Sequence, residues 1–164
     1  MPVQGVPILE DRYPSTMDLY PMEAEEFNRI YPFYQNLKEK KLTTTKCKNC
    51  GSTTFPPRVV CPECNSEELE WIELPTRGKV VQFSEELAGV PLGFDPPLIH
   101  AFINLGGKFR LFLSRIVNCP AGQLKEGDEV QLVVYDVPPM VIDTREGPKE
   151  VPRVFFAFEP VSGS

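Results

Sequence analysis

The pattern of hydrophobic and polar residues changes along the chain and divides it into four segments. Residues 1–21 carry irregularly spaced apolar side chains between prolines, which predicts an extended arm. Residues 22–41 repeat apolar positions at helical spacing. Residues 42–74 hold a set of cysteines between short strands rich in threonine. Residues 75–164 alternate apolar and polar side chains with a period of two, which predicts a β domain.

The arm is richer in large apolar side chains than a disordered tail usually is. Its prolines prevent it from forming a regular helix, and it is too short to close a core of its own. We therefore expect residues 1–21 to lie on another surface, either that of their own chain or that of a partner. We favour a partner-binding arm.

The helical segment predicts two short helices. Its apolar stripe follows the spacing of one helix face and consists of Phe27, Ile30, Tyr31, Tyr34 and Leu37. Pro32 interrupts this stripe, so we expect one helix from about Met22 to Ile30 and a second that starts at Pro32. Proline is tolerated in the first turn of a helix because the N–H group there needs no intrahelical partner.

The β domain predicts five strands, at Lys79–Glu86, Leu98–Leu105, Phe109–Val117, Glu129–Val137 and Arg153–Phe158. Gly106 and Gly107 predict a tight hairpin between the second and third strands. A longer break follows the third strand. Five short strands with this break favour a Greek-key barrel of the OB type. The expected fold is therefore mainly β, with an arm and helices in front of a ribbon and a five-stranded OB-like barrel.

Cys47, Cys50, Cys61 and Cys64 form two CxxC pairs separated by ten residues. Two residues between cysteines let one tight turn present both thiolates to a single ion, and two such turns complete a tetrahedron of sulfur atoms. The spacing predicts a rubredoxin-like zinc ribbon with one Zn²⁺ per chain. Because all four ligands are cysteines, no position stays open for water or substrate, so the expected zinc is structural.

Other uses of these cysteines fit the sequence less well. Two disulfides would suit a secreted protein, but the N-terminus has no basic start followed by an apolar run. A redox CxxC usually occurs singly, at a turn from strand to helix. We therefore expect a cytoplasmic protein whose thiols bind metal.

Charge and hydropathy narrow the expected partners. The chain of 164 residues has 23 acidic and 17 basic side chains, for a formal net charge of -6. Domains that bind nucleic acid are usually basic, although a local basic patch would escape this argument. No apolar run approaches the roughly 20 residues of a membrane span. We expect neither nucleic acid nor a membrane as a partner.

Two pairs of sequence motifs follow one another along the ribbon and the start of the barrel. FPPR at residues 55–58 precedes CPEC at 61–64, and Trp71 precedes GKV at 78–80. With the order of helices, ribbon and barrel, they make the chain resemble the zinc-ribbon/OB-fold proteins that accompany thiolases and other acyl-CoA enzymes. The resemblance covers about residues 25–160. It extends to the small subunits of aromatic-degradation thiolases, of which benzoylsuccinyl-CoA thiolase is one.

The resemblance implies a scaffold or accessory subunit. Family members bind thiolases, hydroxymethylglutaryl-CoA synthases and steroid side-chain hydratases or aldolases. It therefore implies a thiolase-like catalytic subunit as partner, and we expect two chains of each kind in the complex. An acyl-CoA substrate would be bound through the complex. A module that binds nucleic acid through its ribbon and barrel is the alternative.

The residues themselves favour an accessory role, because a thiolase needs an activated nucleophilic cysteine on a much larger fold. Cys119 is the only cysteine outside the ribbon motif, and we interpret it as a small apolar residue. His100 is the only histidine and falls within a predicted strand, where a structural role is commoner than a catalytic one. We therefore expect no catalytic residues in this chain.

The remaining candidates are binding surfaces. Four cations on or beside predicted strands and knuckles are possible contacts for the phosphates of CoA, namely Arg58, Lys108, Arg110 and Arg115. For each of them, a solvated or salt-bridged strand residue is the alternative. Two apolar loops, at residues 88–97 and 138–152, are candidates for an acyl channel or a partner interface.

Overall fold

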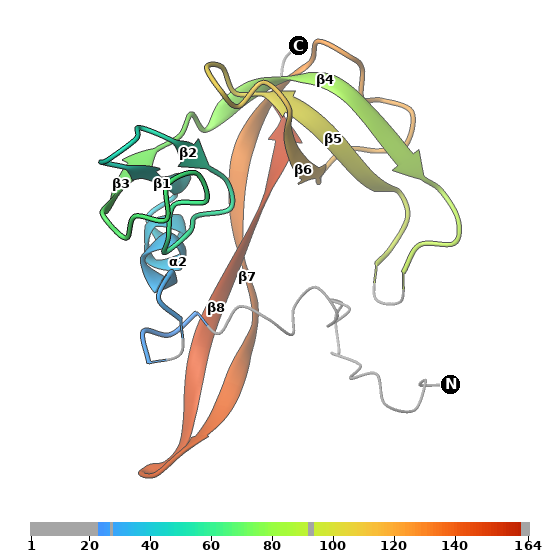
Figure 1. The fold of residues 1–164 in the computed structure, drawn as a ribbon. Helices are drawn as coiled ribbons and strands as arrows, with labels where there is room; N and C mark the ends of the chain where they lie inside the picture. Colours follow the sequence, from blue (N-terminus) through green and yellow to red (C-terminus); the bar gives the residue numbers. More distant parts are fainter. Residues whose placement is uncertain (1–22, 27, 92–93, 162–164) are drawn as a thin grey trace.

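The structure is a computed structural model, which describes residues 23–26, 28–91 and 94–161 (Figure 1). The described elements are α2 (Tyr31–Lys38), β1 (Thr43–Cys47), β2 (Thr53–Thr54), β3 (Leu69–Glu73), β4 (Arg77–Glu86), β5 (Leu98–Asn104), β6 (Phe112–Ile116), β7 (Glu129–Thr144) and β8 (Gly147–Pro160). The fold is mainly β, as predicted. Within the described residues, no helix is long and apolar enough to cross a membrane.

The helical segment contains one regular helix in its described part. Helix α2 begins at Tyr31 and has proline in its first turn, close to the predicted start. The predicted helix from Met22 to Ile30 is wrong for its described residues, which form turns. Asn28 explains this, because its side-chain oxygen accepts a hydrogen bond from the N–H of Ile30 at 3.0 Å and competes with helix formation. Met22, Phe27 and the arm lie outside the described residues, so partner binding by the arm stays a prediction.

The ribbon is a three-stranded antiparallel sheet in the order β2-β1-β3. Strand β1 lies in the centre, and Thr45 pairs with Thr54 on one side and with Trp71 on the other. Val59 and Val60 do not add a strand to this sheet; they form a bend that leads into the second cysteine pair.

The second sheet has the strand order β4-β5-β6-β8-β7, and β7 returns to β4. This is the connectivity of an OB-like barrel. The seam between β6 and β8 is its weakest join, because these strands form one parallel pair, Ile116 with Phe158. The N–H of Val117 donates to the Phe158 carbonyl at 2.8 Å and completes that join.

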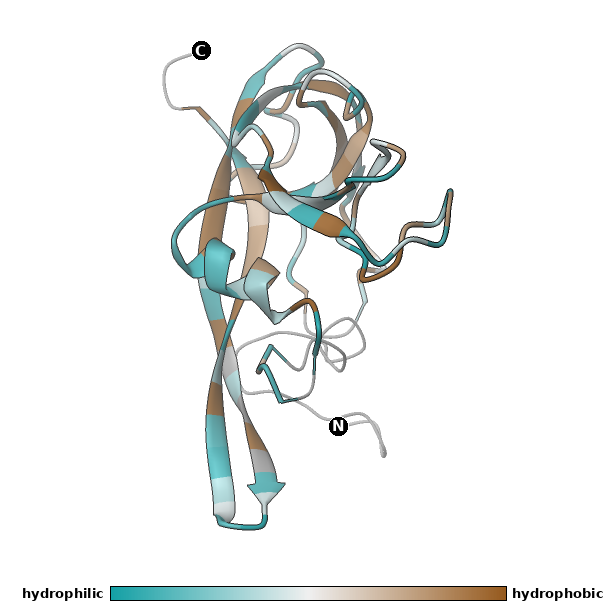
Figure 2. Ribbon diagram, turned by 60° about the vertical axis from the view of Figure 1, so that its left-hand side comes forward, coloured by the Kyte–Doolittle hydropathy of each residue, from teal (hydrophilic) through white to brown (hydrophobic). Residues whose placement is uncertain are grey.

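Strands β7 and β8 continue beyond the barrel as a long hairpin, which reaches below the barrel and ends in a hydrophilic tip (Figures 1 and 2). The predicted loop at residues 138–152 is therefore wrong. Pairing shifts between Val137 and Met140, where Pro138 and Pro139 fall, and then continues to Thr144. A proline cannot donate to a strand ladder, but a bulge accommodates it and lets the ladder resume.

One hydrophobic core joins the helix, the ribbon and the barrel. Its buried side chains are Phe33, Leu37, Leu42, Leu74, Val80, Ile99, Ala101, Ile103, Leu105, Phe112, Ile116, Leu124, Val130, Val154 and Phe158. Leu42 and Leu74, at the two ends of the ribbon, are part of it, and the N–H of Leu74 donates to the Leu42 carbonyl at 2.8 Å. The ribbon is therefore fixed to the barrel at its base.

Phe55 connects the three parts of this core. Its ring lies 4.6 Å from that of Phe112 on β6, 6.0 Å from that of Phe33 on α2 and 6.1 Å from that of Phe156 on β8, measured between centroids. Aromatic pairs at such separations stabilise a core beyond the burial of their area. The packing of Phe55 therefore explains why an aromatic residue stands first in the FPPR motif.

Candidate functional site: a zinc ribbon and a barrel cavity

The four ribbon cysteines meet at one point. Their sulfur atoms all lie within 4.8 Å of one another. The Sγ atoms of Cys47 and Cys64 are 3.6 Å apart, and those of Cys50 and Cys61 are 3.5 Å apart. A tetrahedron with Zn–S distances of about 2.3 Å has edges of about 3.8 Å, so the set has the size of a zinc site. The four predicted ligands are thus brought together and support a structural zinc.

The two knuckles repeat the same hydrogen bonds. The N–H of Cys47 donates to Ser52 and the N–H of Cys61 to Ser66, at 2.8 and 2.9 Å. The carbonyls of the same two cysteines accept from Gly51 and Asn65, both at 2.9 Å.

Gly51 and Asn65 close the two turns with positive φ angles of 72° and 57°. The position of Gly51 directly after Cys50 indicates such a turn from the sequence, whereas Asn65 was not predicted. Asparagine tolerates this conformation better than most residues, and it directly follows the last cysteine, so the signal was present.

One of the four cysteines favours the thiolate in the metal-free fold, whereas contact with the neighbouring thiols raises the pKa of Cys50 to about 12. The N–H of Cys50, followed by that of Asn49, points at the Cys47 sulfur and lowers the pKa of that thiol to about 6. Thiolate, and not thiol, is the form that binds metal. Cys47 and Cys61 are buried, whereas Cys50 is exposed. The Nζ atom of Lys46 lies 3.7 Å from Oε1 of Glu70 on the adjacent strand, so the two side chains form an ion pair within the ribbon.

Threonines of β1 hold the knuckles to the rest of the chain. The hydroxyl of Thr45 accepts from the N–H of Arg58 at 3.0 Å and donates to its carbonyl at 3.1 Å. The hydroxyl of Thr43 accepts from the side chain of Asn36 on α2 at 3.1 Å. Both threonines are buried. The sequence showed these residues only as β formers, and their hydroxyl contacts depend on segments distant in sequence.

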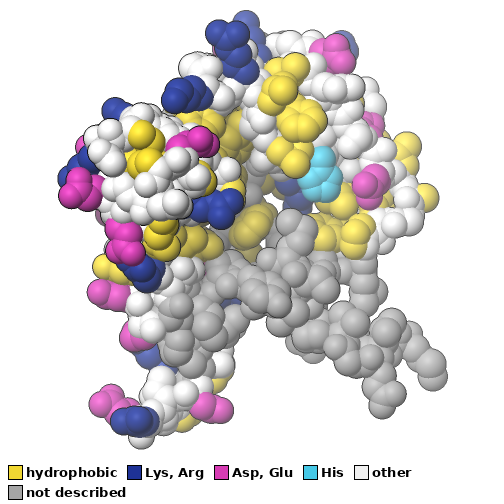
Figure 3. All heavy atoms as spheres, in the orientation of Figure 1, with side chains coloured by type: hydrophobic (Ala, Val, Ile, Leu, Met, Phe, Trp, Pro, Cys, Tyr) yellow, Lys and Arg dark blue, Asp and Glu magenta, His cyan; other side chains and the backbone are white. Residues whose placement is uncertain are grey.

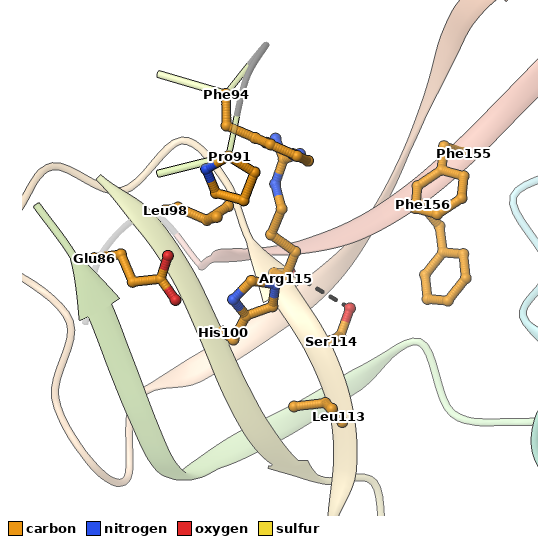
Figure 4. Close-up of a pocket in the computed structure, with 10 residues that line it drawn as sticks. All are labelled: Glu86, Pro91, Phe94, Leu98, His100, Leu113, Ser114, Arg115, Phe155 and Phe156. Atoms are coloured by element: carbon orange, nitrogen blue, oxygen red, sulfur yellow. Dashed lines mark hydrogen bonds between the residues drawn. The ribbon is translucent and has the colours of Figure 1, made fainter. Parts of the chain in front are cut away.

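A second feature is a cavity of about 350 Å³ on the outer side of the barrel, at the weak seam between β6 and β8. Its lining residues are Glu86, Pro91, Phe94, Leu98, His100, Leu113, Ser114, Arg115, Phe155 and Phe156. Figure 4 shows Phe155 and Phe156 on β8 across the cavity from His100. The wall is mostly apolar, with a few polar groups at defined places, as in many small-molecule sites.

Arg115 is the cation of this cavity. It is half-buried, and its guanidinium lies 5.2 Å from the centroid of the Phe94 ring (Figure 4). This cation–π contact holds the side chain over the cavity. His100 pairs with Arg115 across β5 and β6 and also faces the cavity. Phe94 belongs to the apolar loop at residues 88–97, which was predicted to line an acyl channel or a partner interface. This loop therefore reaches the cavity through Phe94.

The other predicted anion contacts lie apart from Arg115. Arg58 is in the ribbon, where its backbone binds Thr45. Lys108 and Arg110 are exposed on the turn between β5 and β6. The structure therefore does not collect the four cations around one point, and only Arg115 lines the cavity.

Beside the cavity lies an apolar surface that the sequence analysis missed. Phe102 on β5 pairs with Leu113 on β6, and both side chains are exposed, as is Leu111. In Figure 3 hydrophobic side chains gather above the single histidine, His100. The alternation of β5 and β6 was the available signal, because it places apolar residues on both faces of these strands.

Comparison with known proteins identifies the family. Residues 35–70 match the family model described as the ChsH2 rubredoxin-like zinc ribbon domain. Over 116 residues the chain is 34% identical to benzoylsuccinyl-CoA thiolase subunit BbsA of Thauera aromatica, covering 71% of this chain and 74% of that protein. It is 30% identical over 126 residues to a DUF35 domain-containing scaffold protein of Methanothermobacter thermautotrophicus, covering 73% and 86%. The chain belongs to the DUF35 family of zinc-ribbon proteins.

The fold agrees with this assignment. It is similar to the solved Ltp2-ChsH2(DUF35) aldolase, with a TM-score of 0.56 and 20% sequence identity over 84% of this chain and 98% of that chain. The resemblance inferred from the FPPR and CPEC motifs is therefore confirmed.

Proposed function

We propose that this chain is a non-catalytic subunit of an acyl-CoA enzyme of the thiolase type, in which zinc shapes the ribbon and the barrel contributes to the acyl-CoA site. The observation that carries the proposal is the similarity over 74% of the length of a protein named as a thiolase subunit. The scaffold proteins among the relatives support the same kind of role.

The surroundings of Cys119 support a role without catalysis. Its sulfur donates to the neighbouring Pro120 carbonyl at 3.7 Å. Burial, followed by the negative charges of Glu85 and Asp128, raises the pKa of this thiol. A thiolase nucleophile needs the opposite, a base or a cation that favours the thiolate. The reacting cysteine of the proposed complex therefore belongs to the partner subunit.

The barrel cavity gives the accessory role a physical form. Its apolar wall suits the acyl part of a CoA thioester, and Arg115 offers a cation to a carboxylate or phosphate of the same ligand. Exposed Phe102 and Leu113 beside it suit the apolar centre of a protein interface. We propose that the partner covers this side of the barrel, so that the cavity opens toward the partner's active site.

Purification of the tagged full-length chain from its native cells tests the assembly. We expect a thiolase-like protein in equal amount, and a complex mass that fits two chains of each kind. The isolated chain should have no thiolytic activity, and Cys119→Ala should leave the activity of the complex unchanged. Recovery of the chain with nucleic acid in place of an enzyme would contradict the proposal.

A cavity-filling variant tests the acyl site. Leu113→Trp enlarges a side chain that lines the cavity, whereas Leu111→Trp changes an equally exposed leucine that does not. In the complex, Leu113→Trp should raise KM for bulky acyl-CoA substrates by about tenfold, a change of about 1.4 kcal/mol, and leave KM for acetyl-CoA unchanged. Equal effects of both variants would remove the cavity from the proposed function.

A further inference from the structure

A cleft of about 290 Å³ lies between the ribbon and the turn that joins β5 to β6. Thr53 on β2 and Ile72 on β3 form its wall on the ribbon side. Residues 105–109 of the turn form the opposite wall, and Pro75 lies between the two (Figure 1). None of these residues lines the barrel cavity, so this is a separate site. We call it the ribbon cleft.

Backbone hydrogen bonds hold both walls of the ribbon cleft in place. In the turn, the N–H of Leu105 donates to the Phe109 carbonyl, and the N–H of Phe109 donates to the Gly106 carbonyl, both at 2.9 Å. On the other wall, Ile72 pairs with Thr44, which is buried in the central strand of the ribbon. A site with ordered walls loses little conformational entropy when it binds. The cleft is therefore preformed in the isolated chain.

The size and chemistry of the ribbon cleft fit one large side chain of another protein. Its volume lies just below the range of about 300–1,000 Å³ that is typical of small-molecule sites. Apolar side chains such as Ile72 and Phe109 line both walls, and Lys108 is the one charged residue among the described residues of the lining. Large side chains that fill such pockets are the usual anchors of protein interfaces. An apolar anchor with a carboxylate beside it would satisfy both parts of the cleft.

The cations around the ribbon cleft lack acidic partners in the described part of the chain. Lys108 forms no ion pair there, and neither do Arg110 beside it and Lys79 on β4. All three side chains are exposed, although the chain as a whole has a net charge of -6. Figure 3 shows Lys and Arg side chains next to the hydrophobic side chains that gather above His100. This local basic group favours a partner surface that carries carboxylates.

We propose that the ribbon cleft is an anchor site for the thiolase-type catalytic subunit, and that it receives an apolar side chain next to an aspartate or glutamate of that subunit. The inference rests on the proposed function and specifies how the partner docks. Phe102 and Leu113 lie on the strands of the β5–β6 hairpin and Lys108 lies on its turn, so one partner surface can cover both contacts. The ribbon, which zinc would hold in shape, then forms part of the docking surface.

Carbodiimide cross-linking tests the contact in the complex of the full-length chain with the catalytic subunit that purifies with it. The reagent joins an amine to a carboxylate without a spacer, so it reports direct ion pairs. We expect a cross-link from Lys108 to an aspartate or glutamate of the catalytic subunit, located by mass spectrometry. Lys125 is the matched control, because it is also exposed and forms no ion pair within the described residues. It should give no cross-link to that subunit.

Two pairs of variants measure what the ribbon cleft contributes to affinity. Lys108→Glu should raise the Kd of the complex at least about tenfold, whereas Lys125→Glu makes the same change of charge elsewhere and should change the Kd less than about twofold. Pro75→Trp places an indole at the cleft and should raise the Kd about tenfold. Thr76→Trp is its control, because Thr76 is also exposed but does not line the cleft. Zinc content should be the same in all four variants, which separates loss of docking from unfolding of the ribbon.

The outcomes distinguish this inference from the proposed function. A complex that forms as proposed, but whose Kd responds to neither Lys108→Glu nor Pro75→Trp, would overturn the anchor site and leave the proposed function standing. A cross-link from Lys108 to a second copy of the chain would assign the cleft to self-association and would also overturn the inference. If no catalytic subunit purifies with the chain, the proposed function fails and the anchor site fails with it.

Discussion

The carboxylate of Glu23 accepts a hydrogen bond from the backbone N–H of Val154, with distances of 3.1 and 2.9 Å to its two oxygens. Both residues are buried. Strand β8 lacks a full neighbour on this side, since β6 pairs with it only at Phe158. A side chain from a segment distant in sequence thus satisfies a strand edge that would otherwise leave a donor unpaired in the interior.

Glu23→Ala should therefore lower the free energy of unfolding by about 1–3 kcal/mol, because the Val154 N–H loses its acceptor while it stays buried. Urea denaturation of the purified chain measures this change. Glu25→Ala is the matched control, because Glu25 is exposed and its loss should change stability little. Equal stability of the two variants would show that water replaces the carboxylate at β8.

The zinc site gives a second prediction. Elemental analysis should find one zinc per chain, and Cys47→Ser should lose the metal and unfold the ribbon. Zinc binding supplies folding free energy on the order of 10 kcal/mol in small zinc modules, so no other contact in the ribbon can compensate. Cys119→Ser is the control, because Cys119 lies outside the four-sulfur cluster and should keep full zinc content. Iron in place of zinc, or no metal, would contradict the prediction.

Features that depend on residues close together in the sequence were predicted, and features that depend on residues far apart in the sequence were not. The CxxC spacing is a local signal, and it predicted the ribbon and its four ligands. Period-two alternation found all five barrel strands. The extension of β7 and β8 was missed because Pro138 and Pro139 suggested a break, whereas pairing with β8 resumes beyond the bulge. A ladder formed with a distant strand outweighs a local proline signal.

The cavity was harder to predict for the same reason. Its lining comes from several elements, among them β6 and β8, whose residues Arg115 and Phe155 are far apart in the sequence. Arg115 was selected only as one of four cations, and nothing local separated it from Lys108 or Arg110. The contact of its guanidinium with Phe94 is formed by the fold, so its place in the cavity required the structure.

Gly78 provides a third prediction, which concerns how closely β4 approaches β5. A Cβ atom at Gly78 would lie 2.6 Å from Cγ2 of Ile103 and 2.7 Å from the carbonyl oxygen of Asn104. The carbonyl belongs to the β5 backbone and cannot move aside. Gly78→Ala should lower the free energy of unfolding by about 1–3 kcal/mol through overpacking. Lys79→Ala, on the exposed face of the same strand, is the control, and thermal unfolding of both variants measures the difference.

The last prediction concerns Tyr34, whose burial, followed by the negative charge of Glu23, raises the pKa of its phenol to about 12. The folded state thus holds this proton more tightly than the unfolded state, in which the pKa is about 10. The stability that results is fully present below pH 10 and should be lost as the pH rises toward 12.

Tyr34→Phe has no phenolic proton, so its stability should fall less over this interval than that of the unmodified chain. Denaturation at a series of pH values measures both curves. Glu23→Gln removes the charge next to Tyr34, and the pKa of the phenol in that variant should decrease, as read from tyrosinate absorbance after subtraction of the Tyr34→Phe spectrum. Parallel curves for the unmodified chain and Tyr34→Phe would show that Tyr34 titrates as it does in water.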